Sequence, residues 1–188
     1  AELTALLYPS VRASLFQRNH VNLLHNNFND NGITVRWNEP LKRKAWNQGW
    51  QAMRSRFGMT ADRSWEYLSW RFFKHPFIAY KYAIACDPVG TIVGLLVLRI
   101  ERARRFRIAR IVDIVSRPDA DTPLIQSAIS FARKQRCVAI DAYLTYSEYH
   151  KQFAVCGFRD ARKYGLYVVP ELFNPFAERP QDPKKSII

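Results

Sequence analysis

Two carboxylates lie inside apolar stretches of the sequence, where an ionised acid is costly unless it is paired. Asp113 is part of RIVDIV, and Asp141 is part of CVAIDAYLT, and both stretches have the composition of central strands. A buried carboxyl with a raised pKa would suit a general base. The alternative for Asp113, and the more common one, is a structural ion pair with Arg71, Arg99 or Arg110.

The other residue types that carry chemistry exclude several kinds of site. The four histidines have no metal-binding spacing with cysteines or acids, and the sequence has neither an HExxH motif nor a nucleophile elbow. We therefore expect no metal. Cys86, Cys137 and Cys156 are odd in number, far apart and in apolar settings, which is typical of buried thiols in a reducing cytosol. We expect a cytoplasmic protein.

The charge of the chain selects polyanionic partners. The formal net charge is +13 and the pI is near 10.0, so the surface field would draw nucleic acid, anionic lipid or a phosphate-rich cofactor. The most biased segment is RIERARRFRIAR, at a turn between two strands. Guanidinium groups there could bind phosphate, but Phe106 is the one interleaved aromatic, so nucleic-acid binding is weakly supported and a solvated turn is the commoner alternative.

The periodicity of apolar residues predicts one α/β domain over residues 32–173. Residues 1–31 are predicted to be an arm or linker, and residues 174–188 a loose, proline-rich tail. No apolar run approaches the roughly 20 residues that span a bilayer. The expected elements are, in chain order, a strand at 33–37, helices at 41–57 and 64–74, three antiparallel strands between 77 and 115, a helix at 123–135, a strand at 137–144, a helix at 147–156 and a last strand at 164–172.

This order of elements resembles the fold of the GCN5-related N-acetyltransferases (GNAT), with a mixed sheet of an antiparallel meander and a parallel crossover, flanked by helices. A short helix that runs into Gly157 and Phe158 is similar to the family's helix, Gly-Phe and final strand. DRSWEYLSWRFFKHP resembles a helix of divergent members, some of which form the second half of a tandem chain. The aromatic residues of this region could wall an acceptor pocket, although core packing is the commoner role.

The resemblance implies a site for acetyl-CoA, or another acyl-CoA, where the strands at 108–115 and 137–144 splay apart. The pantetheine arm would pair with the backbone of Ile114, Val115 and Ser116, and the pyrophosphate would meet the start of the next helix. The helix residues implied there are Thr122, Leu124 and Ile125. The family often places a tyrosine acid four residues before the Gly-Phe, and that position is Phe153. A phenyl ring donates no proton, so Tyr149, Tyr146 or water must act instead.

The turn that should hold the pyrophosphate, SRPDADTP, has no glycine to let phosphate approach closely. If the helix starts at Pro123, that residue deletes one donor, and Asp119 and Asp121 repel an anion. We therefore expect weak coenzyme A binding. The resemblance implies an acyl-CoA-dependent N-acyltransferase, or a degenerate form of one, with a small-molecule or peptide amine as acceptor. The alternative is a non-catalytic module whose basic face binds an acidic partner; the oligomeric state stays open.

Overall fold

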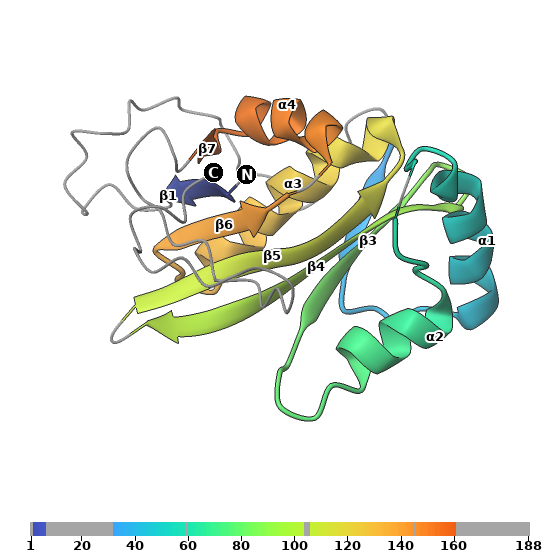
Figure 1. Cartoon of the computed structure of the whole chain (residues 1–188), viewed down its shortest axis with the longest axis horizontal. Coiled ribbons are helices and arrows are strands. Elements are labelled where there is room, and N and C mark those ends of the chain that lie inside the picture. The colour runs from blue at the N-terminus through green and yellow to red at the C-terminus, as the bar shows by residue number, and fades with distance from the viewer. Residues whose placement is uncertain (1, 7–31, 59, 104–105, 145, 161–188) are drawn as a thin grey trace, which may run out of the picture.

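The computed structural model describes residues 2–6, 32–58, 60–103, 106–144 and 146–160. These residues form one mixed β-sheet with helices on both faces (Figure 1). The strands stand in the order β2-β3-β4-β5-β6-β1-β7. Their bounds are β1 Glu2–Leu6, β2 Thr34–Trp37, β3 Lys81–Cys86, β4 Ile92–Ala103, β5 Phe106–Ser116, β6 Ala139–Tyr143 and β7 Arg159–Asp160.

The sheet has the predicted meander and crossover. Neighbouring strands from β2 to β5 pair antiparallel. β5 and β6 pair in parallel, since helix α3 (Pro118–Lys134) connects them. A parallel pair needs such a crossover to return the chain to the same end of the sheet. The predicted α/β fold class is therefore confirmed.

The helices before the meander follow the apolar spacing. Helix α1 (Arg43–Arg54) buries Trp46, Trp50 and Met53 on one side. Helix α2 (Trp65–Leu68) starts after its N-cap Ser64, whose hydroxyl accepts from the backbone N–H of Tyr67. A π-helical turn, η2 (Ser69–Phe73), continues it. Helix α4 (Ser147–Val155) follows β6.

The core fills both sides of the central strands. Leu96 and Leu98 of β4 and Ile125 of α3 are fully buried. The side chain of Ser116 faces α3, because a methyl group added at Gly94 would touch both Ser116 and Leu124. Asp113, three residues earlier on β5, points to the opposite face, where α1 and the segment before α2 lie. The end of β5 is thus in contact with helices of both layers.

Helix α3 begins earlier than the sequence analysis predicted. Its first residue is Pro118, and Pro123 lies inside the helix. Proline is favoured at the first helical position, because its ring presets φ and its missing N–H is unbonded there in any helix. The prediction took Pro123 as the first residue of the helix, whereas Pro118 is the first residue. Asp119, Asp121 and Thr122 are therefore helical residues and not parts of a loop.

The far edge of the sheet contains a strand that the sequence analysis did not assign. Residues Glu2–Leu6 form β1, which pairs antiparallel with both β6 and β7. The remaining part of the predicted arm, residues 7–31, lies outside the described residues, as do the predicted strand at 164–172 and the tail. The division of the chain into arm, domain and tail stays a prediction.

The contact between α1 and β4 gives a test of the packing. A Cβ at Gly49 would stand 2.6 Å from the carbonyl oxygen of Ile92, which is backbone and cannot rotate away. We expect Gly49→Ala to lower the free energy of unfolding by about 1 to 3 kcal/mol. This loss would occur although alanine is the better helix former by about 1 kcal/mol. Chemical denaturation measures the change.

The matched control is Gly58→Ala, because a Cβ there meets nothing within 4 Å. We expect its effect to stay within about 0.5 kcal/mol. A Gly49→Ala protein more stable than the parent would contradict the close approach of α1 to β4.

Candidate functional site

The sheet opens between β5 and β6. The two strands pair from Ile108 opposite Ala139 to Ile111 opposite Ala142, and the pairing goes no further. β5 continues to Ser116 while it remains paired with β4. The backbone from 112 to 116 therefore has one edge that β6 does not cover, as the predicted splay between these strands requires.

Two backbone carbonyl positions face this opening. The N–H of Arg117 donates to the carbonyl of Val93, so the carbonyl of Ser116, in the same peptide unit, points the other way. The backbone N–H and carbonyl groups of Ile114 point to the same side, because the direction of these groups along a strand repeats every second residue. Val115, between them, pairs with Leu95 of β4. Ile114 and Ser116 are thus the residues of β5 whose backbone an extended ligand could reach.

Arg56 already occupies part of this edge. Its Nη1 donates to the carbonyl oxygen of Ser116 at 2.6 Å. The same guanidinium forms two hydrogen bonds with the carboxylate of Asp121, at 2.9 and 2.7 Å. The Asp121 side chain is 0% exposed and that of Arg56 is 16% exposed. The hydrogen bonds that Arg56 donates to Asp121 raise the pKa of Arg56 above its ordinary value, and this effect exceeds the lowering by burial. The pair is therefore ionic.

This pairing corrects the expected role of the acidic residues. Asp121 is buried and neutralised by Arg56, and it does not face an incoming anion. Asp119 is exposed and pairs with Arg117 at 2.6 Å, and this contact lowers the pKa of Asp119. The sequence analysis expected both carboxylates to repel an incoming anion. This expectation is wrong, because each carboxylate is paired with an arginine.

Ser116, Tyr149 and Tyr146 form a polar cluster with Arg56. The Ser116 hydroxyl donates to Asp121 at 2.6 Å and lies 3.2 Å from the Tyr149 hydroxyl. Tyr146 donates to the carbonyl oxygen of Arg56 at 3.2 Å. The rings of Phe57, Tyr146 and Tyr149 surround the guanidinium at 5.2 to 5.8 Å. Burial raises the pKa of Tyr149, so its hydroxyl keeps its proton.

Asp113 forms an ion pair, as the alternative interpretation expected, but with a different partner. Its carboxylate accepts from Nε and Nη2 of Arg63 at 3.0 Å each. Burial lowers the pKa of Arg63, but the hydrogen bonds and charge of Asp113 more than offset this and raise it overall. The proposed partners Arg71, Arg99 and Arg110 do not make this contact; Arg110 pairs instead with Asp141 at 2.9 Å.

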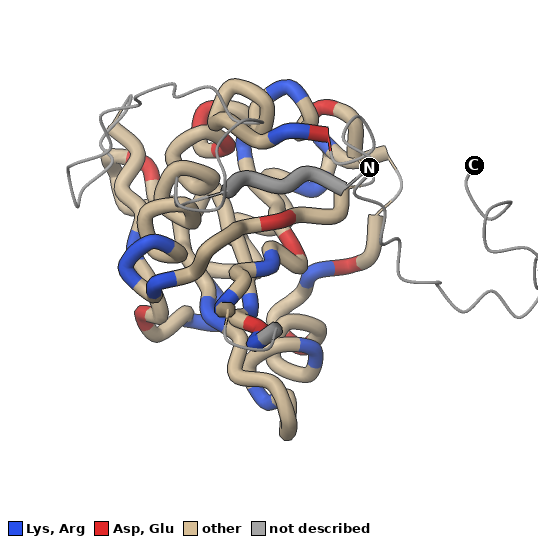
Figure 2. Tube along the Cα trace, turned by 90° about the vertical axis from the view of Figure 1, so that its left-hand side faces the viewer, with Lys and Arg blue, Asp and Glu red and all other residues tan. Residues whose placement is uncertain are grey.

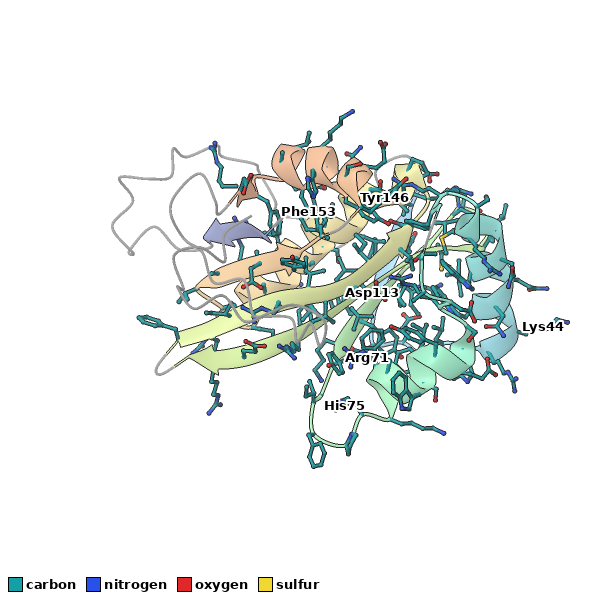
Figure 3. The ribbon with its side chains drawn as sticks, viewed as in Figure 1. Lys44, Arg71, His75, Asp113, Tyr146 and Phe153 are labelled. Atoms are coloured by element: carbon teal, nitrogen blue, oxygen red, sulfur yellow. The ribbon has the colours of Figure 1, made fainter. Side chains whose placement is uncertain are left out.

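The other predicted site residues separate into two groups. Thr122 lies inside α3, and its hydroxyl contacts Gln152 of α4 at 3.2 Å. Leu124, Ile125 and Phe153 are fully buried core residues, and the Phe153 ring packs edge-on against Phe158. Figure 3 shows Tyr146 near the start of α4, Phe153 farther along this helix and Asp113 on β5. Leu124, Ile125 and Phe153 support the opening but do not line it.

Other kinds of site find no support in the part of the chain that the structure describes. Its histidines, cysteines and acids form no group of three that could hold a metal ion. None of its helices is both long enough and apolar enough to cross a membrane. The three cysteines are buried and unbonded. Arg104 and Arg105, at the predicted basic turn, lie outside the described residues.

Comparisons with known proteins bear on the fold. No family profile and no curated protein matches the sequence. Among solved structures, a probable acetyltransferase superposes with a TM-score of 0.54 at 16% identity, over 72% of this chain and 96% of its own. A Trypanosoma brucei acetyltransferase gives a TM-score of 0.50 at 16% identity, over 68% and 93%. The chain has the GNAT fold.

In this GNAT-fold protein, the residues that the opening depends on come from distant parts of the sequence. Arg56 follows α1, Ser116 ends β5, and Tyr149 lies on α4. The sequence analysis named Ser116 and both tyrosines but missed Arg56. No local pattern distinguishes Arg56 from the other arginines near it. One signal was available. If the helix starts at Pro118, Asp121 lies on its buried side, and a buried carboxylate requires a cation as partner.

Replacement of Asp121 tests the buried pair. Asp121→Asn leaves the largely buried Arg56 guanidinium without its counter-charge. We expect the free energy of unfolding to fall by about 3 to 5 kcal/mol. Urea denaturation at neutral pH measures it.

The matched variant is Asp119→Asn, because its partner Arg117 is exposed on the surface. We expect a loss of no more than about 1 kcal/mol. Equal losses in the two variants would contradict the burial of Asp121.

Proposed function

We propose that this protein is an acyl-CoA-dependent N-acyltransferase that moves an acetyl group from acetyl-CoA to an amine. The observation that carries the proposal is the uncovered edge of β5 beside β6 in a GNAT fold. An extended thioester arm with amide groups can add to such an edge by backbone hydrogen bonds. Ile114 and Ser116 would hold it. The acceptor is a small-molecule or peptide amine.

The fit of the co-substrate is good at the strand and poor at the helix. The carbonyl of Ser116 points into the opening, but it accepts from Arg56, so Arg56 must release it before a ligand amide can bind there. The first turn of α3 carries Pro118 and an exposed Asp119, and neither favours a phosphate. The expectation of weak coenzyme A binding therefore stays, although Asp121 is no longer a reason for it.

Within this proposal, the chain's residues position groups and move one proton. Acetyl-CoA supplies the activated acyl group. Transfer forms a carbon–nitrogen bond, breaks the carbon–sulfur bond and leaves a thiolate that needs a proton or a hydrogen bond. We assign that role to Tyr149, because its protonated hydroxyl lies beside Ser116 at the opening. Tyr146 is the alternative donor, and water takes the proton from the amine.

Asp113 fits the role of general base less well. Both of its oxygens accept hydrogen bonds from Arg63, so they are already occupied and not directed at an acceptor amine. Its contribution in this proposal is to fix Arg63 against Trp50 beneath the end of β5.

A second candidate is the non-catalytic module that binds an acidic partner. The contact between Arg56 and Ser116 favours it, since a guanidinium fills the edge that an acyl-CoA would use. The loss of the tyrosine acid at Phe153 favours it as well, because that ring is core. The two candidates differ in one measurable property, which is the binding of acetyl-CoA.

The test combines calorimetry with acetyl-CoA and a thiol-release assay over a panel of amines. We expect binding and slow turnover by the parent protein. Tyr149→Phe should reduce kcat by about 100-fold and leave the Kd for acetyl-CoA unchanged, because the hydroxyl acts in transfer and not in binding.

Tyr143→Phe is the matched control for the loss of a tyrosine hydroxyl, since Tyr143 is 47% exposed on β6, and it should keep full activity. Tyr146→Phe distinguishes the alternative donor. A folded parent protein that neither binds acetyl-CoA nor releases thiol would reject the enzyme and leave the binding module.

A further inference from the structure

The π-helical turn η2 and the loop that joins it to β3 each carry one large apolar side chain that is exposed to water. Phe77 is 91% exposed and Trp70 is 71% exposed, whereas Phe72, between them in sequence, is 4% exposed. Large apolar side chains that are exposed near one another often mark a contact surface. Burial of each one in a partner stabilises the complex by about 1.5 to 3 kcal/mol. We call residues 70–77 the aromatic tip.

The aromatic tip projects from the molecule, and the two hollows that its residues help to line are both open to solvent. Figures 1 and 2, which are views at right angles, both show the loop between α2 and β3 extending from the lower end of the molecule. Figure 3 places His75 on this loop, well away from Tyr146 and Phe153. A projecting loop suits a broad, flat partner, whereas a small ligand would need an enclosing pocket.

The loop is held in one conformation by the imidazole of His75. Its Nδ1 accepts from the backbone N–H groups of Phe77 at 3.3 Å and Ile78 at 3.1 Å. The ring also packs edge-on against Tyr80, with centroids 5.6 Å apart. Phe77 is therefore presented by a folded turn, so little ordering entropy is lost when it is buried in a partner.

The charges within the aromatic tip have one sign, because residues 70–77 include Arg71 and Lys74 and no acid. Between Glu66 and Asp87 the sequence has no acidic residue, and it has Arg71, Lys74 and Lys81. Arg71 and Lys74 are exposed, and in the part of the chain described neither forms an ion pair. The Arg71 guanidinium lies over the Phe72 ring at 5.9 Å. The surface is thus apolar at its end and cationic around its base, on a protein of net charge +13.

We propose that the aromatic tip docks this protein onto anionic phospholipid membranes. Phe77 and Trp70 enter the interfacial layer, and Arg71 and Lys74 remain at the level of the lipid phosphates. A convex apolar end with a cationic base matches a flat surface that is anionic outside and apolar below. A second copy of the chain fits poorly, since a symmetric contact would bring the same cations together. Single-stranded nucleic acid would need a groove.

The test is co-sedimentation of the full 188-residue protein with vesicles of phosphatidylcholine alone or with added phosphatidylglycerol. We expect binding to the anionic vesicles that weakens with salt, and little binding to the neutral ones. Phe77→Ser should weaken binding about ten-fold. Arg71→Gln and Lys74→Gln should each weaken it about five-fold. Thermal melts check that the variants fold.

Matched controls change the same chemistry elsewhere on the surface. Val89→Ser replaces an apolar side chain that is 85% exposed in the turn between β3 and β4, and Lys44→Gln removes an exposed cation from α1. Both should bind vesicles as the parent does, which locates the effect at the aromatic tip.

Several results would overturn the proposal. These are no binding to anionic vesicles, equal binding by Phe77→Ser and the parent, or equal binding to neutral vesicles. A parent dimer that Phe77→Ser makes monomeric would assign the surface to self-association. Binding of a single-stranded oligonucleotide that requires Phe77, without vesicle binding, would assign it to nucleic acid.

Discussion

The buried ion pair between Arg56 and Asp121 joins the parts of the molecule that form the opening of the sheet. Arg56 comes from the end of the first helical layer, and Asp121 from the first turns of α3 on the other face. The shared partner Ser116 belongs to the end of β5. A charge in this position is tolerated because every oxygen of Asp121 is hydrogen-bonded. The contact also holds Ser116 and, through the Ser116 hydroxyl, the hydroxyl of Tyr149.

The sequence was sufficient to predict most elements and the order in which they build the sheet. Apolar periodicity located β3, β4, β5 and α1, since local patterns and burial agree there. It failed at α3, where either of two prolines five residues apart could mark the start of the helix. The sequence analysis chose Pro123, whereas the helix starts at Pro118. It also missed β1, because a five-residue strand at a distant edge has no local signal apart from its partners.

The candidate site was predictable as a region but not as a set of contacts. The apolar surroundings of Asp113 and Asp141 indicated that each needs a cation, and each has one. The pairing of each acid with a particular arginine depends on how elements that are distant in the sequence pack together. The spacing of residues in the sequence does not contain that information. Arg56 and Arg63 both follow α1 in the structure, whereas the sequence analysis placed Arg56 inside the helix at 41–57 and Arg63 in the connection after it.

The position of β1 has a consequence for how the chain folds. This strand is placed between β6 and β7, so the last edge of the sheet joins the first described residues to the last. Contacts between such distant segments close late, because the loop entropy must be lost before the hydrogen bonds form. During synthesis, residues 2–6 leave the ribosome long before β6 exists, and the backbone N–H and carbonyl groups on that edge of β6 stay unpaired until β1 pairs with them. The helices and the meander can form early, whereas this edge completes the sheet last.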